Sequence, residues 1–407
     1  MKAKIIALFL GLSPFTATLG GEPLPFVESP SSSFGIAPLN LDLIPSLGIT
    51  YDTNLNRTAA LETDAVKYYA GLGIVVSSAD PGETLFEWAI RADVDFFEYD
   101  IDTDRDNVDF SLKASAALNG AKTTAQLSAY FLLNNGNTAS LDNRIREERS
   151  ADSSDYGLIF SATRDLPRGY LEASASVDYR DFEQSFSGAQ GLSDYQSYSA
   201  DLAYFLSPGF APKMDFGFGL GVGYEEADVS SEQFILEPTA RVKWRISAKT
   251  SAFASVGAEF RSIDDSGGVT EDDPVNLSFR GGLVWEPSPL TTFTTSVYRD
   301  GNSSVSLANQ NYNAVGVGFD VSQSLPYSVS ATAFFAYENA EYYSLTAVST
   351  DREDDFFRGG VSLSKTLNVP VAPVTVSVFY NYNENDSSDP LSSYDQHLIG
   401  AKASATF

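Results

Sequence analysis

Cysteine, histidine and positive charge are all scarce in this sequence of 407 residues. Without any cysteine, the chain forms no disulfide, holds no metal through thiolates, has no cysteine nucleophile and takes no lipid on an N-terminal cysteine. Its one histidine, His397, excludes a histidine-rich metal site. We therefore expect no bound metal and no cofactor.

Basic residues are outnumbered by acidic ones along the whole chain. There are 26 Lys and Arg against 54 Asp and Glu, which gives a formal net charge of −28. Binding to phosphate backbones needs a basic face, so the charge excludes a nucleic-acid partner. A soluble, secreted acidic protein stays open on charge alone.

Long apolar runs are absent as well. The chain begins with the basic stretch Met1–Lys4, continues with the apolar run Ile5–Leu12, and turns small and polar over Ser13–Gly20. This order is typical of a secretory signal peptide. The run is far shorter than the ~20 residues that a membrane-spanning helix needs, and no other segment comes closer. We predict a signal peptide over residues 1–20 and no transmembrane helix.

The dominant positive feature is an alternation with period two. Apolar residues hold one parity and polar or small residues hold the other, and helical spacing of three and four residues is not found. In one such segment the apolar parity consists of Phe86, Trp88, Ile90, Ala92, Val94 and Phe96. Residues 214–225, 234–246 and 374–383 follow the same rule. The pattern predicts an all-β chain.

The connections between these segments alternate in length. Short turns such as Asn119-Gly120 and Leu166-Pro167-Arg168 alternate with long acidic loops such as residues 134–153 and 300–310. Transmembrane barrels show this alternation, because their tight turns face the periplasm and their long loops face outside. Counting gives about eighteen strands between Leu39 and Phe407, most of them about ten to fourteen residues long, with sixteen strands as the alternative.

A membrane explains why the strands must close into a ring. In hydrocarbon every backbone amide has to be paired within the protein, so no strand edge is tolerated. A β-sandwich would have shorter strands, of about five or six residues, and a solenoid would show a fixed repeat. We predict a closed antiparallel transmembrane β-barrel over residues 39–407, after a flexible periplasmic arm over residues 21–38. The expected surroundings are the lipid and lipopolysaccharide of a Gram-negative outer membrane, and the oligomeric state is left open.

The last strand, Leu398–Phe407, ends on a phenylalanine. Ile399, Ala401, Ala403, Ala405 and Phe407 share one parity. This strand resembles the C-terminal signature of outer-membrane proteins, although Ala405 stands where that signature has an aromatic residue. The resemblance implies that Phe407 is an assembly signal read by the barrel-assembly machinery.

The start of the barrel, Ile36–Thr58, is similar to the beta-barrel porin 2 family. The matching residues are Pro45, Leu47, Ile49, Tyr51, Asp52 and Asn54, with Thr53 between the last two. The resemblance implies a porin-like barrel. This specific likeness covers about twenty residues, whereas the general barrel pattern covers Leu39 to Phe407.

The inward parity is where we expect function, because a barrel of about eighteen strands holds an aqueous lumen. Three adjacent strands supply a basic arc of Arg241, Lys243, Arg245, Arg261 and Arg280. The strand opposite supplies Glu87, Arg91, Asp93 and Asp95. One hypothesis is a transverse field across the pore that favours polar solutes. The alternative is that these charges pair locally and only solvate the wall.

Two further features of the lumen are open at this point. The inward aromatic residues either form a track for sugars or fill space; they are Tyr69, Tyr130, Phe205, Phe253 and Tyr298. The third external loop, Asn134–Asp152, folds inward if it follows general porins, and otherwise covers the outer surface.

We expect no enzyme activity, because His397 lies near the external end of the final strand on the outward parity, without a serine motif as partner. The first functional hypothesis is a channel for passive diffusion of small polar solutes. The second is a component that binds or exports extracellular polysaccharide, and the third is a closed structural barrel.

Overall fold

The computed structural model describes residues 34–36, 39–55, 57, 62–78, 85–101, 106–134, 153–182, 194–227, 230–264, 275–303, 310–344, 352–390 and 392–407. The expected signal peptide lies outside the described residues. So does the expected arm apart from residues 34–36, and so does the third external loop after Asn134. The predictions for these segments stay predictions.

All regular structure in the described residues is β-strand. The strands are β1 (Phe34–Ile36), β2 (Leu39–Asp52), β3 (Ala65–Ser78), β4 (Phe86–Tyr99), β5 (Asn107–Asn119), β6 (Thr123–Asn134), β7 (Ser153–Leu166), β8 (Gly169–Phe182), β9 (Tyr195–Leu206), β10 (Met214–Ala227), β11 (Ser230–Ser247), β12 (Thr250–Ile263), β13 (Val275–Ser288), β14 (Thr291–Ser303), β15 (Gln310–Leu325), β16 (Val329–Ser344), β17 (Arg352–Asn368), β18 (Pro373–Ser387) and β19 (Tyr394–Ala405).

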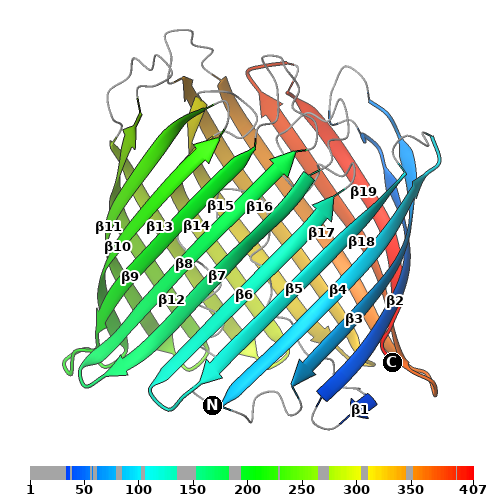
Figure 1. Cartoon of the computed structure of the whole chain (residues 1–407), viewed down its shortest axis with the longest axis horizontal. Coiled ribbons are helices and arrows are strands. Elements are labelled where there is room, and N and C mark those ends of the chain that lie inside the picture. Colours follow the sequence, from blue (N-terminus) through cyan, green and yellow to red (C-terminus); the bar gives the residue numbers. More distant parts are fainter. Residues whose placement is uncertain are drawn as a thin grey trace.

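Strands β2 to β19 form one closed antiparallel ring. Each pairs with its neighbours in chain order, and β19 pairs with β2, so that Ser404 lies opposite Ser46 and Leu398 opposite Asp52. Figure 1 shows the strands tilted around a single cylinder. The predicted closed barrel of eighteen strands is confirmed, and the alternative of sixteen is wrong. The short β1 adds to β2 alone.

The short connections lie together at one end of the cylinder, the end that also carries the C-terminus (Figure 1). Two-residue turns join β7 to β8 and β11 to β12. In the turn between β15 and β16, Tyr327 and Ser328 adopt positive φ values of 63° and 57°. An even number of strands returns both ends of the barrel to this side, which is the periplasmic side in bacterial barrels.

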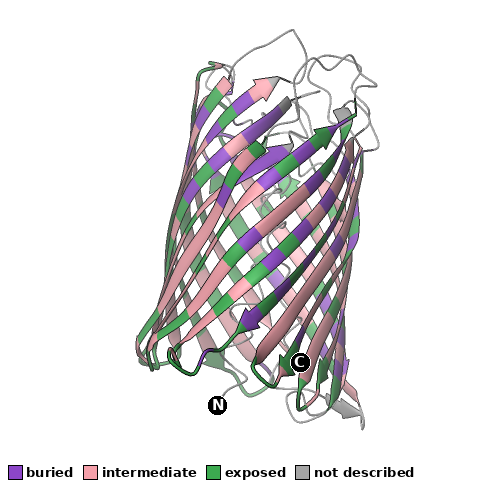
Figure 2. Ribbon diagram, turned by 90° about the vertical axis from the view of Figure 1, so that its left-hand side faces the viewer, coloured by how far each residue is buried: buried purple, intermediate pink, exposed green. Residues whose placement is uncertain are grey.

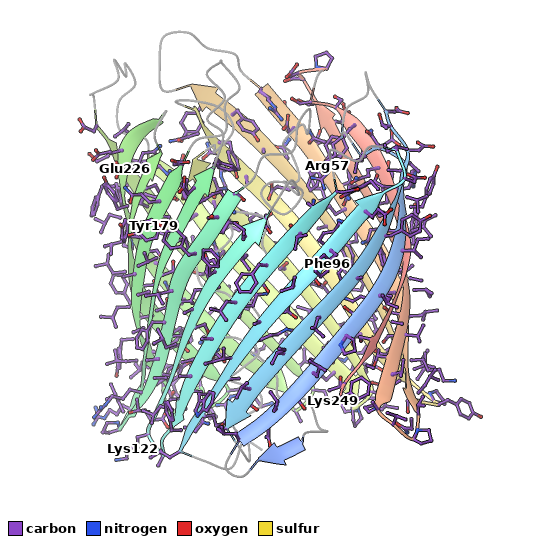
Figure 3. The ribbon with its side chains drawn as sticks, turned by 45° about the vertical axis from the view of Figure 1, so that its right-hand side comes forward. Arg57, Phe96, Lys122, Tyr179, Glu226 and Lys249 are labelled. Carbon is purple, nitrogen blue, oxygen red and sulfur yellow. The ribbon has the colours of Figure 1, made fainter. Side chains whose placement is uncertain are left out.

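The outer face of the barrel is apolar, and Figure 3 shows the side chains on the strands, with the exposed Phe96 of β4 labelled. Leu47, Leu202 and Phe218 are more than half exposed there. Figure 2 shows exposed and less exposed residues alternating along the strands, as the sequence pattern predicts. Exposed apolar side chains around a closed ring fit a barrel whose outer face contacts lipid. Among the described residues no helix is long and apolar enough to cross a membrane.

Several external strand ends extend further than the sequence suggests. The loop expected near residues 300–310 begins later than the sequence suggests, because β14 continues to Ser303; β15 begins at Gln310. β11 has 18 residues, beyond the expected ten to fourteen. Backbone pairing continues in these strand ends beyond the part that faces lipid. The sequence of the ends is polar and therefore resembles a loop.

Candidate functional site

The sequence-predicted pore-lining residues all lie on the inner parity of their strands. On β4, Glu87 and Asp93 alternate with Phe86 and Ile90, which are exposed on the outer face. The predicted residues of β11, β12 and β13 likewise alternate with exposed apolar side chains. Because successive side chains of a strand point to opposite faces, these charged groups point to the lumen.

Arg241 on β11 pairs with a carboxylate two strands away. Its Nη1 and Nη2 donate to the two carboxylate oxygens of Asp201 on β9, at 2.8 and 2.5 Å, and its Nε donates to Thr239 Oγ1 at 2.8 Å. The guanidinium crosses β10 at Gly219, where an added Cβ would lie 2.7 Å from Arg241 Cζ. The glycine therefore makes room for the ion pair.

The next two basic residues toward the periplasmic end differ from each other. Lys243 pairs with Glu172 of β8, with Nζ 2.5 Å from Oε1. Arg245 is exposed and donates from Nη2 to the carbonyl oxygen of Pro212, at 3.2 Å. Arg245 therefore lies against a turn rather than a carboxylate.

Arg280 and Arg261 complete the basic arc. Arg280 on β13 donates from Nη2 to Asp300 Oδ2 of β14 at 2.7 Å. Arg261 on β12 is almost fully buried, with its Nε 2.6 Å from Glu259 Oε1. Its Nη1 lies 3.5 Å from a carboxylate oxygen of Glu225 on β10.

The opposite wall, around β4, is also of mixed charge. β4 and β13 are nine positions apart in the ring of eighteen, so they face each other. Arg91 pairs with Asp93 of its own strand, with Nε 2.8 Å from Oδ2. Tyr69 donates to Asp95 at 2.8 Å, and Lys402 Nζ lies 4.6 Å from the centre of the Tyr69 ring.

The charges of the basic arc and those of β4 are thus both compensated by opposite charges close to them. Four of the five predicted basic residues have a carboxylate partner, and the expected acidic strand has cations beside it. This is the local pairing that the sequence left as an alternative. A net transverse field that selects ions stays a prediction.

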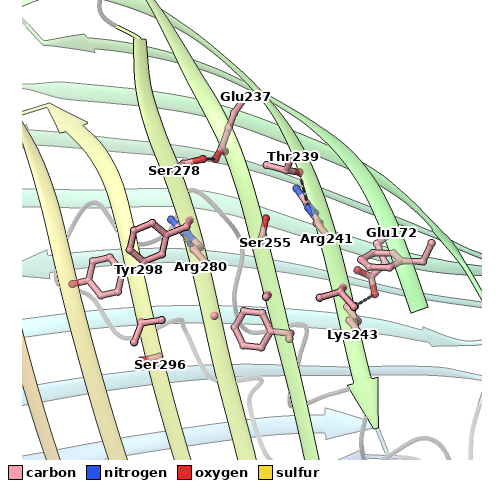
Figure 4. A pocket seen from close by; sticks show the side chains of 17 residues that line it. Glu172, Glu237, Thr239, Arg241, Lys243, Ser255, Ser278, Arg280, Ser296 and Tyr298 are labelled. Atoms are coloured by element: carbon pink, nitrogen blue, oxygen red, sulfur yellow. Dashed lines mark hydrogen bonds and ion pairs between the residues drawn. The ribbon is translucent and has the colours of Figure 1, made fainter. Parts of the chain in front are cut away.

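A cavity of about 260 Å³ opens on the inner wall, and part of the basic arc lines it (Figure 4). We call it the alcove. Its lining includes the following polar and aromatic residues: Glu172, Phe205, Glu237, Thr239, Arg241, Lys243, Phe253, Ser255, Ser278, Arg280, Ser296 and Tyr298. Glu237 accepts a hydrogen bond from Ser278 at 2.5 Å. The alcove thus combines hydroxyl groups and compensated charges with aromatic and aliphatic residues such as Val242, Phe279 and Val297.

The inward aromatic rings lie against the wall over glycines. A Cβ on Gly157 would lie 2.8 Å from a ring carbon of Tyr130, and one on Gly282 would lie 2.3 Å from Phe253. Phe205 covers Gly217 in the same way. These rings therefore fill the space above glycines, and whether they also form a track for sugars stays a prediction.

His397 lies on the outer side, where the sequence placed it. Its Nδ1 is 2.8 Å from the Tyr380 hydroxyl, and its Nε2 is 3.9 Å from an Asp395 oxygen. Among the described residues, no group of three or more His, Asp or Glu side chains is arranged to hold a metal ion.

Sequence reasoning missed the acidic partners of the arc. Asp201, Glu172 and Asp300 share the inner parity of their strands, but parity alone does not say which of them meets which basic residue on a strand one, two or three positions away. It also missed the buried pair of Arg180 and Asp155. The glycines on β10 could have indicated these pairs, because long side chains can reach across a strand at positions that carry no side chain.

Comparison with known proteins gives a partial match. Residues 271–407 match the family described as Surface lipoprotein assembly modifier, which is about a third of the chain. No curated protein matches the chain. The matching family differs from the porin family that the first strand resembles, so the specific family is not shown.

Solved structures of similar shape are outer-membrane proteins. One is OpdK of Pseudomonas aeruginosa with vanillate, with 14% identity, a TM-score of 0.46, and coverage of 90% of this chain and 99% of that one. Another is OccAB2 of Acinetobacter baumannii, with 12% identity, a TM-score of 0.47, and coverage of 92% and 99%. A third is OccK2 (OpdF) of Pseudomonas aeruginosa in complex with glucuronate, with 12% identity, a TM-score of 0.47, and coverage of 91% and 99%. None of these likenesses by itself assigns a function.

Proposed function

We propose that this protein is an outer-membrane channel through which small polar solutes diffuse passively. The observation that carries the proposal is the contrast between the two faces of the closed ring. Its outer face is apolar, whereas its inner face carries compensated charges and hydroxyl groups. Barrels of sixteen to eighteen strands are wide enough for an aqueous channel.

The inner wall suits solutes that carry polar groups. Ion pairs such as Arg241–Asp201 and Lys243–Glu172 hold both signs of charge on the wall, so a passing solute meets donors and acceptors without a single dominant sign. Such a wall solvates sugars, amino acids and other small polar molecules and gives apolar molecules nothing comparable. The proposal includes no catalytic step.

Conductance in a planar lipid bilayer tests the proposal. We expect stepwise, stable single-channel currents after insertion of the purified protein, and none with the same protein denatured before addition. Current blocked by long oligosaccharides would favour the alternative role in polysaccharide binding or export. A folded, inserted barrel without current would exclude the channel and leave the closed structural barrel.

A second candidate follows from the family match over residues 271–407. A surface lipoprotein assembly modifier would act on the display of lipoproteins at the cell surface. If this role holds, deleting the gene lowers the amount of surface-exposed lipoprotein, measured by protease shaving of intact cells, while uptake of small solutes stays unchanged. The channel predicts the reverse pair of results.

The cellular setting belongs to the same proposal. We infer export by the signal peptide over residues 1–20, insertion by the barrel-assembly machinery, and residence among outer-membrane lipid and lipopolysaccharide. The apolar outer face and the return of β2 and β19 to one end of the barrel support this setting. Fractionation of the envelope, with detection of the chain in the outer-membrane fraction, tests it.

A further inference from the structure

The external end of the hairpin formed by β14 and β15 leaves the barrel wall. The last paired residues of β13 and β14 are Phe279 and Arg299, although both strands continue beyond them among the described residues. β14 nevertheless remains paired with β15 as far as Ser303 and Asn311. We call residues 300–303 and 310–313 the inner ledge, because this piece of hairpin has separated from β13.

Gly301 shows to which side the ledge has moved. It shares the outward parity of β14 with Val297, which is exposed on the outer face. A Cβ on Gly301 would nevertheless lie 2.4 Å from Glu259 Oε1 and 3.0 Å from Asn276 Nδ2. Glu259 and Asn276 belong to the inner parities of β12 and β13. The outward side of the ledge therefore rests on the inner face of the wall, and the ledge lies within the lumen.

Arg261 fastens the ledge to the wall. Its Nη2 donates to the carbonyl oxygen of Gly301 at 2.7 Å, and its Nη1 donates to Gln233 Oε1 at 2.9 Å. The Gln233 and Asn311 amides exchange two hydrogen bonds, of 2.9 and 3.0 Å, although β12, β13 and β14 separate their strands in the ring. Arg261, Gln233 and Asn311 are each no more than 2% exposed. The contact is thus a hydrogen-bond network shielded from solvent.

We propose that the inner ledge limits the size of solutes at the external side of the channel, and that Arg261 is the positioning residue that holds the ledge there. The proposal rests on the proposed channel function. A doubled wall on one side narrows the lumen at that level. Without Arg261, the nearest place for the ledge is the unpaired edge of β13 over residues 275–278, which would return it to the wall and widen the entrance.

Replacing Arg261 tests the role in size selection. We expect Arg261→Met to give roughly a twofold rise in single-channel conductance and a larger cut-off for neutral polyethylene glycols, because conductance grows with the free cross-section of the lumen. Arg261→Lys should restore part of the parent cut-off. The matched control is Arg180→Met, which removes another buried pair (Arg180 Nε to Asp155, 2.8 Å) away from the ledge and should leave the cut-off for neutral polyethylene glycols unchanged. An equal or smaller conductance in folded Arg261→Met would overturn the proposal.

Cross-linking tests the position of the ledge without any current. Because the chain has no cysteine, Gln233→Cys with Asn311→Cys introduces the only two thiols. A short bifunctional thiol reagent should join them in the folded protein, and the two single variants serve as controls. No cross-link, although each thiol reacts with a monofunctional reagent, would overturn the ledge itself.

The two experiments separate the ledge from the channel. Cross-linking the cysteine pair in the Arg261→Met background should return the conductance to the parent value, because the ledge is then held covalently. A protein that cross-links but never conducts would retain the ledge and contradict the proposed channel function. A protein that conducts but does not cross-link would support the channel function and contradict the ledge.

Discussion

Lys243 and Glu172 form an ion pair, with Nζ 2.5 Å from Oε1, although β9 and β10 lie between their own strands. The lysine reaches across the ring of Phe205, whose centre is 4.5 Å from Nζ, and past Gly217. Arg241 crosses the same strand at Gly219 to reach Asp201. The inner wall is therefore held by side chains that span strands, and it depends on the glycines beneath them.

Gly219→Val should destabilise the barrel by about 1–3 kcal/mol, the usual cost of forcing extra atoms into a packed site. The added Cβ would lie 2.7 Å from Arg241 Cζ and from Thr239 Oγ1, so the guanidinium must leave Asp201. Urea unfolding of the protein in lipid vesicles measures the change. The control is Gly209→Ala, where a Cβ meets nothing within 4 Å. Equal unfolding midpoints for the two variants would contradict the argument.

Arg241→Met should shift the reversal potential of the channel toward cations. The substitution leaves the Asp201 carboxylate on the lumen wall without its bidentate partner, and a fixed negative charge attracts cations. The double variant Arg241→Met with Asp201→Asn removes both charges and should return the potential most of the way. Neutralising Arg241, Arg245, Arg261 and Arg280 together should give a larger shift than the single change. The same reversal potential in all four proteins would show that the wall charges do not reach the permeating ions.

Leu202→Arg should cost about 2–4 kcal/mol of stability in a bilayer, because its side chain lies on the outer face near the middle of β9, where lipid would surround the charge. Leu202 is 57% exposed and pairs in register with Leu220. Ser255→Arg, on the lumen side of β12, is the matched control and should cost much less. Refolding into vesicles at increasing urea concentration gives both values. If the two substitutions cost the same, the outer face is not the lipid-facing one.

Parity and turn spacing are enough to predict the ring, because both are local properties of the chain. The alternation of Phe86 to Phe96 sets which face of β4 is apolar, and two-residue turns such as Pro167-Arg168 set where strands end. Eighteen strands and the inward placement of residues such as Arg241 follow from these alone. The pairing of Arg241 with Asp201 does not, because it depends on the register of three strands together.

The inner ledge was hidden from the sequence for a different reason. Residues 300–303 and Gln310 were expected in a loop, because the apolar outward parity ends at Arg299 and Gly301 on β14; on β15 the same parity is polar at Asn311 and Asn313. In the structure these polar residues have another cause, since the outward side of the ledge contacts the polar inner wall instead of lipid. A polar outward parity within a paired strand end is therefore a usable signal for an inward-folded hairpin, but only once strand pairing is known.

Two changes at the C-terminus should separate the two roles that Phe407 can have. The Phe407 backbone extends the closing pair of β19 and β2, because its N–H donates to the Leu43 carbonyl oxygen at 3.0 Å and its carbonyl accepts from the Leu43 N–H at 3.1 Å. Phe407→Ala keeps both backbone hydrogen bonds and removes the ring, whereas deletion of Phe407 removes the ring and the two hydrogen bonds. If the ring is the assembly signal, both variants reach the outer membrane at several-fold lower levels in cells, while purified Phe407→Ala refolds in detergent as the parent does. If only closure matters, Phe407→Ala is normal in cells and in detergent, and deletion is impaired in both. Quantitative blots of outer-membrane fractions, set beside refolding yields, decide between the two, and a normal level of the deleted chain in cells would contradict both roles.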